Sequence, residues 1–428
     1  MSSLISFVLL FVVLVGIAVP VAFALGLATM AMFLISDHSL QLFAQRMWTG
    51  LDKFTLVAIP FFILAGELMS GSGILSRLLD FARLVIGRVK GGLLYINILV
   101  SMLFGGINGS AVADASAIGS LLIKATRKEY KDPELAAAVT ACSSIVGPLI
   151  PPSLPMLIYA FAAANVSVAG LFLAGIVPGI AVGIALMGVT WRICRHRSFP
   201  VDQRRYARRE IFRILIRFTV AAVLPVIMVT GIVSGIVTPS EAGCVGIVYA
   251  LLVGFFVTRE LTLKAVYAAM VRTVVVTAVV LLLVSVGNAT TWWLTIEGVP
   301  MILRDAFAGL TGNAAVFLFL MVLLYLLVGM FIEQAAAMIM LVPVFAPLAE
   351  RYGVDPIHFG LVTCLSLALG LVTPPVGLCL FVASGIAETP IQRVFKVSVP
   401  YILATLVLLL VVTFVPQSFL WLPRMFGF

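Results

Sequence analysis

The sequence predicts an all-α protein that crosses a membrane several times, and two observations carry this prediction. Of the 428 residues, 62% are hydrophobic and 11% are charged, whereas soluble domains average about 45–50% apolar and about 25% charged residues. The apolar residues also form long runs, at 4–35, 265–295 and 314–347. A membrane-spanning helix needs about 20 apolar residues, so each run is long enough to span.

The first apolar run is expected to be a membrane helix and not a cleavable signal peptide. No basic residue precedes it, and it is longer than the apolar core of a signal, which has about 7–15 residues. The segment that follows, 37–54, has the pattern of an amphipathic helix lying at the membrane interface.

The net charge of +9 is concentrated in one segment. Nine of the 27 Lys and Arg residues fall between Arg192 and Arg217. Short basic loops between membrane helices mark the cytoplasmic side, so we expect this loop to be cytoplasmic; binding of anionic lipids is the alternative. Either reading ties the basic charge to a lipid bilayer, and no nucleic-acid partner is expected.

The reactive residues do not form a catalytic or metal-binding pattern. The chain has five cysteines and three histidines, without the spacing of zinc, haem or iron–sulfur sites. No Walker motif or HExxH sequence occurs, and no Ser/His pair lies in an apolar segment. A membrane enzyme is therefore disfavoured, and no organic cofactor is expected.

The chain repeats itself at an offset of 223 residues. The segment Val139–Ala164 aligns without a gap on Val362–Ala387, and the shared residues include Gly147 with Gly370 and the two Pro-Pro pairs, Pro151-Pro152 and Pro374-Pro375. Proline lacks a backbone N–H and its ring clashes with the preceding turn. Each half should therefore contain one membrane helix broken at its proline pair, unless the prolines only kink the helices for packing.

Each half also has an interrupted apolar segment before its broken helix, at 103–120 and 326–342. Both are too polar at the centre for plain spans, so we expect two re-entrant helical hairpins, with turns at Asn108–Ser110 and Gly329–Gln334. Paired interruptions in two halves indicate the midplane site of a secondary transporter. An odd number of crossings between the halves would make the repeats inverted; a pure channel is less compatible with paired hairpins.

Broken helices can bind ions through their main chain. A break leaves free carbonyl groups on one side and free N–H groups on the other, and the helix dipole adds partial charge to each. Carbonyl oxygens suit sodium, and N–H groups suit a carboxylate. We expect two or more sodium ions. The predicted ligands of the first site are Asn108, Ser110, Gly147 and Pro151, and those of the second are Gly329, Gly370, Thr373 and Val376.

The substrate is expected to be an anion held between these sites. No Lys or Arg lies within the proposed core, so N–H groups, hydroxyls and amides would have to bind it. Intramembrane acids are functional candidates by default. The candidates for substrate contacts are Gly109, Asp114, Ser143, Ser153, Asn165, Glu333 and Gln334.

Several segments together resemble a known family. "FGGINGSAVADASAIGS", "GPLIPPSLPMLIYA", "GIVTPSEAGCVGIVYALL", "DPIHFGLV" and "GLVTPPVGLCLFVASGIA" resemble, in this order, the large membrane subunit of tripartite ATP-independent periplasmic (TRAP) transporters, DctM type. The resemblance covers nearly the whole chain. It departs from the family at Asn108, where serine is usual, and at Glu333, where the usual acid comes one residue earlier.

The resemblance implies an elevator-type transporter with inverted repeats in the bacterial inner membrane. It implies two partners, a small four-helix membrane subunit of the DctQ type, expected as a separate chain, and a periplasmic binding protein of the DctP type. It also implies sodium-driven import of carboxylates such as C4-dicarboxylates or sialic acid. A stand-alone symporter or antiporter of the same architecture is the alternative.

On this basis the chain divides into five parts. Residues 1–91 and 168–314 would form mainly the scaffold, the latter with the basic loop. Residues 92–167 and 315–395 would form the moving transport domain, one repeat each, and 396–428 the C-terminal helix.

Overall fold

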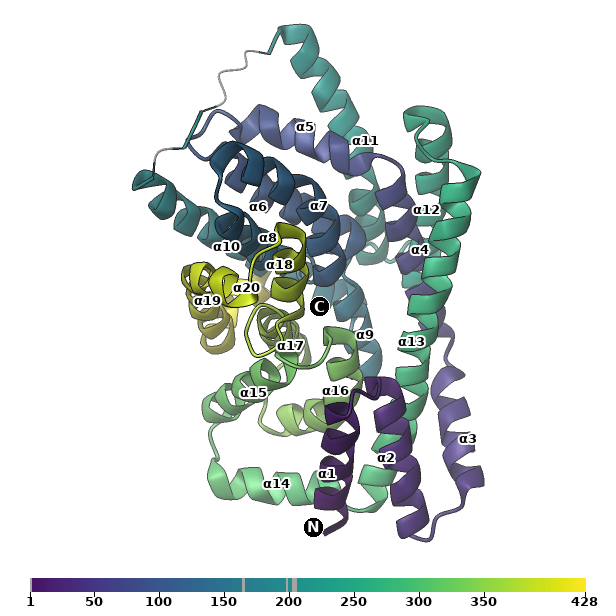
Figure 1. Ribbon diagram of the computed structural model, residues 1–428. Helices are drawn as coiled ribbons and strands as arrows, with labels where there is room; N and C mark the ends of the chain where they lie inside the picture. Colours follow the sequence, from purple (N-terminus) through teal and green to yellow (C-terminus); the bar gives the residue numbers. More distant parts are fainter. Residues whose placement is uncertain (1, 164–165, 198, 202–205) are drawn as a thin grey trace.

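The structure is a computed structural model that describes residues 2–163, 166–197, 199–201 and 206–428. The regular elements of this part of the chain are all helices (Figure 1), which confirms the predicted all-α class. Five helices are long and apolar enough to cross a membrane: α10 (Val168–Arg195), α11 (Arg208–Val233), α12 (Pro239–Leu252) with the π-helix Val253–Thr258, α13 (Leu263–Ile296) and α19 (Ile391–Phe414).

A sixth candidate span is bent. Helices α4 (Ala58–Gly71) and α5 (Ile74–Ile86) meet at an angle of 66°. Two further helices outside the two repeats are short: α14 (Val299–Leu310) and α20 (Gln417–Met425).

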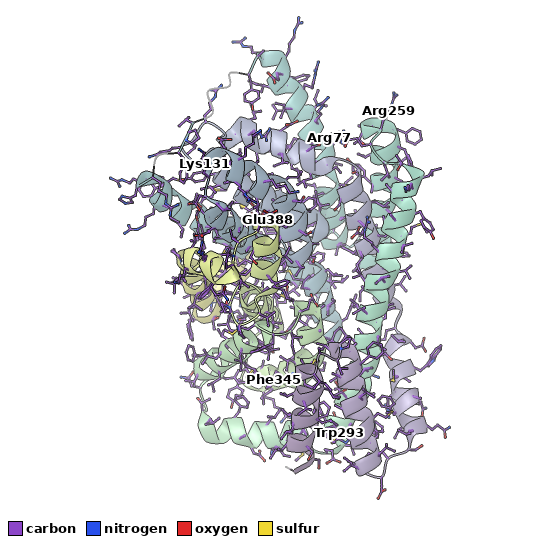
Figure 2. The ribbon with its side chains drawn as sticks, viewed as in Figure 1. Arg77, Lys131, Arg259, Trp293, Phe345 and Glu388 are labelled. Carbon is purple, nitrogen blue, oxygen red and sulfur yellow. The ribbon has the colours of Figure 1, made fainter. Side chains whose placement is uncertain are left out.

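The N-terminal apolar run forms two helices, so the prediction of a single membrane helix is wrong. Helices α1 (Ser2–Gly16) and α2 (Val21–Ile35) have 15 residues each and pack side by side (Figure 1). The chain turns between them because Pro20 cannot donate the hydrogen bond that a continuous helix needs. Both helices cover the end of α13 that carries Trp293 (Figure 2). The rings of Phe7 and Trp293 are 5.3 Å apart.

The predicted amphipathic segment is helix α3 (Leu40–Leu51), which lies along α13 (Figure 1). Two side chains of α13 hold its carbonyl groups: the Ser285 hydroxyl donates to Met47 O at 3.0 Å, and the Asn288 amide donates to Arg46 O at 2.7 Å. These bonds fix where the chain leaves α3 and enters the 3-10 helix Phe54–Val57.

Both predicted hairpins and both predicted helix breaks are present. Each unit consists of two hairpin helices followed by two halves of a broken helix. In the first unit these are α6 (Gly92–Asn108), α7 (Ala111–Tyr130), α8 (Pro133–Ser144) and α9 (Leu154–Ala162). In the second they are α15 (Ala314–Gly329), α16 (Gln334–Arg351), α17 (Pro356–Gly370) and α18 (Leu378–Ala387).

The two units interlock through the second halves of their broken helices. Helix α9 of the first unit packs against α16 and α17, and α18 of the second unit packs against α7 and α8. The first hairpin occupies the upper part of the molecule in Figure 1 and the second hairpin the lower part. Both proline pairs have a cis peptide bond. Because α9 and α18 begin directly after the breaks, the two breaks lie where the units meet.

Candidate functional site

The tip of the first hairpin packs directly against the first break. Gly109 has a φ of +64°, and a β-carbon there would lie 2.9 Å from the backbone nitrogen of Leu154 and 3.0 Å from Pro152 O. Only glycine fits this combination of backbone angle and space. Ser110 follows and caps α7, accepting a hydrogen bond from the Ala113 N–H at 3.5 Å. Asn108 is the last residue of α6, and only its main chain is described.

The carboxyl group of Asp114 lies behind this tip, at the break. Asp114 is fully buried. A β-carbon on Gly147 would collide with its Oδ2, and one on Gly105 would lie 3.4 Å from the same oxygen. The carbonyl of Pro151 also faces the hairpin, 3.1 Å from where a Gly106 β-carbon would be. The first unit thus brings one carboxylate together with the main chain at the break, an oxygen-rich arrangement of the kind that binds sodium.

The tip of the second hairpin is bonded to the second break. The Gly377 N–H donates to Met330 O at 3.3 Å. A β-carbon on Gly370 would lie 2.6 Å from the Gly329 Cα, so the two main chains are in contact. The Thr373 hydroxyl donates to Leu369 O at 2.8 Å, and its oxygen can still accept or coordinate.

Two polar side chains begin the returning helix of the second hairpin. Glu333 caps α16 by accepting hydrogen bonds from the N–H groups of Ala335 at 2.9 Å and Ala336 at 3.3 Å. The buried Gln334 amide donates to Cys364 O on α17 at 2.9 Å. The Gln334 bond fixes the second hairpin against its broken helix.

The two tips meet at one narrow cleft. Its volume is about 20 Å³, and its lining includes Ser110, Ala111, Leu154, Pro155, Glu333, Gln334 and Leu371. Three helices, α7, α9 and α16, begin at this cleft. Free N–H groups and the helix dipole make such N-termini favourable for anions. The cleft therefore brings together the N-termini of three helices, one of them already capped by the Glu333 carboxylate, next to the two breaks.

Not every predicted site residue reaches the cleft. The Ser143 hydroxyl lies 2.8 Å from that of Ser101, between α6 and α8. Ser153 donates to Pro148 O at 2.6 Å and caps α9. Val376 is exposed at the end of the second break. Asn165 lies outside the described residues.

Sequence reasoning missed two features of the site. The N-terminus of α9 at Leu154 was readable, because a serine N-cap followed by proline in the first turn is a helix-start signal. The second feature is Lys53: although no Lys or Arg lines the cleft, Lys53 lines a neighbouring cavity of about 290 Å³. No sequence signal pointed to it, since Lys53 is far along the chain from both units.

A multi-pass helical protein with two hairpin-and-broken-helix units around one cleft has the architecture of a secondary transporter. The chain belongs to the family of the DctM component of tripartite ATP-independent periplasmic transporters, whose family model matches residues 7–418. It is therefore the large permease subunit of a bacterial inner-membrane transporter, and not an enzyme.

Two curated relatives match over nearly their whole length. The sialic acid TRAP transporter large permease protein SiaM of Vibrio cholerae is 39% identical over 408 residues, covering 95% of both chains. The C4-dicarboxylate TRAP transporter large permease protein DctM of Pseudomonas aeruginosa is 34% identical over 405 residues, covering 94% of both.

Solved transporter structures share the fold. The YdaH transporter of Alcanivorax borkumensis superposes with a TM-score of 0.62 at 19% identity, over 89% of this chain and 88% of its own. MtrF of Neisseria gonorrhoeae superposes with a TM-score of 0.53 at 12% identity, over 87% and 83%. At these identities the similarity concerns the fold alone.

Proposed function

We propose that the chain imports an organic anion together with sodium ions. The observation that supports this most is the convergence of three helix N-termini on one cleft between two helix breaks. The N-termini of α7 and α9, which are capped only by neutral serine hydroxyls, favour a carboxylate, while carbonyl groups released at the breaks favour a hard cation. Binding both in one place would couple the anion to the sodium gradient.

The first sodium ion would lie between the Asp114 carboxylate and the main chain near Gly147 and Pro151. The second would lie between Gly329 and Gly370, with the Thr373 hydroxyl as a further ligand. Because each ion would sit between a hairpin tip and a broken helix, sodium binding would stabilise the packing of the tip. The anion site at the cleft would then form fully only when sodium is present.

The transport step would be an elevator movement. The two units are interlocked through α9 and α18, so they would move as one body against a scaffold that includes α3, α4 and α13. The relatives named for sialic acid and C4-dicarboxylates suggest the substrate class, an organic acid. We also propose that the chain works with a small membrane subunit and a periplasmic binding protein, as the word tripartite in the family description implies.

Reconstitution tests this proposal. The chain would be placed in proteoliposomes with its small subunit and binding protein, and uptake of sialic acid, succinate and isethionate would be measured with and without an inward sodium gradient. We expect uptake of at least one acid that needs both the gradient and the binding protein. Uptake unaffected by removal of sodium would refute the coupling, and uptake without the binding protein would favour a stand-alone symporter.

A further inference from the structure

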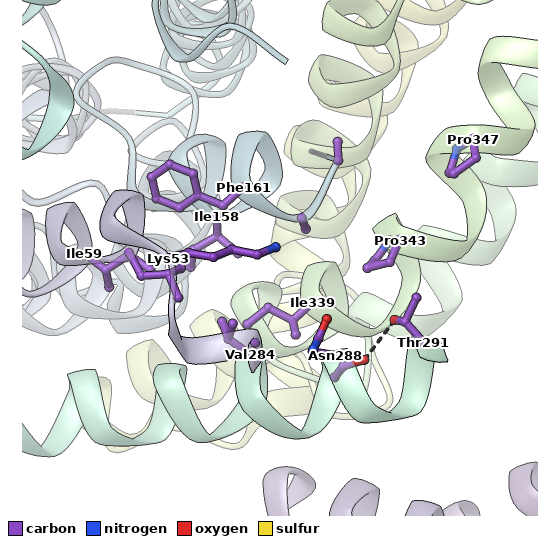
Figure 3. A pocket seen from close by; sticks show the side chains of 15 residues that line it. Lys53, Ile59, Ile158, Phe161, Val284, Asn288, Thr291, Ile339, Pro343 and Pro347 are labelled. Atoms are coloured by element: carbon purple, nitrogen blue, oxygen red, sulfur yellow. Dashed lines mark hydrogen bonds between the residues drawn. The ribbon is translucent and has the colours of Figure 1, made fainter. Parts of the chain in front are cut away.

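A second cavity lies beside the cleft, between the two interlocked units and the helices around α13. It has a volume of about 290 Å³. Ile158 and Phe161 of α9 and Ile339 and Pro343 of α16 line one side (Figure 3). The end of α3 and one face of α13 line the other. Its walls are mostly apolar with a few polar groups, which is the usual make-up of a small-molecule site.

The cavity and the cleft are neighbours, because Ile158 lines both. The cleft, at about 20 Å³, has room for about one water molecule and not for an organic acid. The cavity approaches the volume of ligand pockets, which begins at about 300 Å³. An organic anion next to the tips in this conformation would therefore occupy the cavity.

The cavity contains one positive charge. Lys53 is the single Lys or Arg in its lining, and Figure 3 shows its amino group extending into the space between α9 and α16. None of the ion pairs found among the described residues includes Lys53. Its position is fixed by the anchoring of α3 on α13, where Asn288 and Ser285 hold the preceding carbonyl groups. An ammonium group offers three hydrogen-bond donors, and because Lys53 is exposed, these donors are accessible to an anion.

The other two polar side chains offer acceptors. The Asn288 amide nitrogen already donates to Arg46 O at 2.7 Å and to the Thr49 hydroxyl at 3.4 Å, which leaves its oxygen to accept. The Thr291 hydroxyl donates to Gly287 O at 2.8 Å, so only its lone pairs remain. One cationic donor facing two neutral acceptors matches a molecule with one carboxylate and several hydroxyl groups.

We propose that this cavity binds a hydroxylated organic acid, with Lys53 binding its carboxylate and Asn288 and Thr291 accepting hydrogen bonds from its hydroxyl groups. The inference rests on the proposed function, because it identifies the anion as the transported acid waiting beside the tips. A second carboxylate would find no second cation in the lining, so a dicarboxylate fits less well than a sugar acid.

Direct binding tests the role of Lys53. The full chain in lipid nanodiscs with sodium chloride would be titrated with N-acetylneuraminate, D-gluconate and succinate. We expect wild type to prefer the hydroxylated acids, and Lys53→Gln to raise their Kd by about tenfold or more, the effect of losing a charged hydrogen bond. Lys53→Arg should stay within about threefold, since it keeps the charge. Lys264→Gln, which removes an exposed lysine from the start of α13, should bind like wild type.

The methyl ester of the best-bound acid separates charge recognition from shape, because it should bind wild type and Lys53→Gln equally. An unchanged Kd in Lys53→Gln, or no binding of any hydroxylated acid to wild type, overturns the inference. Sodium-driven uptake in the reconstituted complex is a separate measurement: Lys53-dependent binding without sodium-driven uptake contradicts the proposed function alone, and uptake with Lys53-independent binding contradicts this inference alone.

Discussion

The two hairpin-and-broken-helix units share one backbone plan but are held together differently. In the first unit, polar side chains join α6 to α8: the Asn97 amide donates to the Thr140 hydroxyl at 2.6 Å, and the Ser101 and Ser143 hydroxyls are 2.8 Å apart. All four residues are buried. The interface between the first hairpin and its broken helix is therefore a hydrogen-bonded network.

In the second unit, the equivalent interface is largely apolar. Thr363 and Ser366 occupy the positions that match Thr140 and Ser143 at the 223-residue offset. The Thr363 side chain faces the Tyr325 hydroxyl, and the buried Ser366 hydroxyl has no hydrogen-bond partner among the described residues. The rings of Tyr325 and Phe359 pack between α15 and α17, 6.0 Å apart. Aromatic packing here replaces the polar network.

The acidic residues near the two breaks also differ between the units. Glu333 matches Ser110 at the repeat offset, whereas Asp114 matches an alanine, Ala337. The first unit places its carboxylate inside, beside Gly147, and the second unit uses its carboxylate to cap α16. The comparison shows that the approach of main chain to main chain is common to both repeats, while charge and packing are not. The two proposed sodium sites should therefore differ in strength.

The largest loss of uptake is expected from substitutions at the close main-chain approach that both units share. Gly370→Ala would place a methyl group 2.6 Å from the Gly329 Cα, and Gly147→Ala would collide with Asp114, so each should abolish uptake. Gly385→Ala on α18 is the control, because its β-carbon would meet nothing within 4 Å. Uptake in proteoliposomes, normalised to folded protein, measures the effect. Near-normal transport by Gly370→Ala or Gly147→Ala would show that the close approach is dispensable.

The next largest effect concerns the sodium dependence of uptake, in which the acids of the two units should differ. Asp114→Asn removes a charge beside the first break, so the sodium concentration for half-maximal uptake should rise about tenfold or more. Glu333→Gln keeps an oxygen that can cap α16, so its shift should stay below about threefold. Sodium titration of uptake gives both values. A larger shift in this sodium concentration for Glu333→Gln than for Asp114→Asn would mean that the second unit, and not the first, supplies the charged sodium ligand.

A smaller effect should appear in stability. Asn97→Ala would leave the buried Thr140 and Ser143 hydroxyls short of a partner, at a cost of about 1–2 kcal/mol in the free energy of unfolding. Tyr325→Phe removes a hydroxyl that faces Thr363 without hydrogen-bond geometry, and should cost less than about 0.5 kcal/mol. Denaturant unfolding of the detergent-solubilised chain compares them. Equal losses would mean that the two interfaces are more alike than their hydrogen bonds indicate.

The smallest effect concerns an ion pair on the surface, which joins the two units. Arg127 on α7 donates to Glu388, at the end of α18, at 2.8 Å, and both side chains are exposed. The hydrogen bond and charge of Arg127 lower the pKa of Glu388. The contribution of this ion pair to the free energy of unfolding is thus present above the ordinary pKa of glutamate. It is lost as the pH falls through the lowered pKa of Glu388. The melting temperatures of wild type and Glu388→Gln should differ slightly at neutral pH and converge in acid or high salt; a difference that grows in acid would contradict this.

The sequence by itself determined the helical membrane class, both hairpin turns and both helix breaks. These features follow from residues that act on their own backbone: apolar runs of spanning length, prolines that cannot continue a helix and glycines that allow a tight tip. The same local rule at Pro20 separates α1 from α2, where the length of the apolar run suggested one helix.

Only the tertiary structure decided which of these local features meet. Ser143 and Ser153 were chosen for their hydroxyls, but the packing of α6 on α8 and the start of α9 engage both within the protein. Lys53 lies beside the tips only because α3 is anchored on α13. Apolar helix surfaces fit one another in many ways, so their order in the chain does not specify their neighbours; the hydrogen bonds and glycine contacts between helices do.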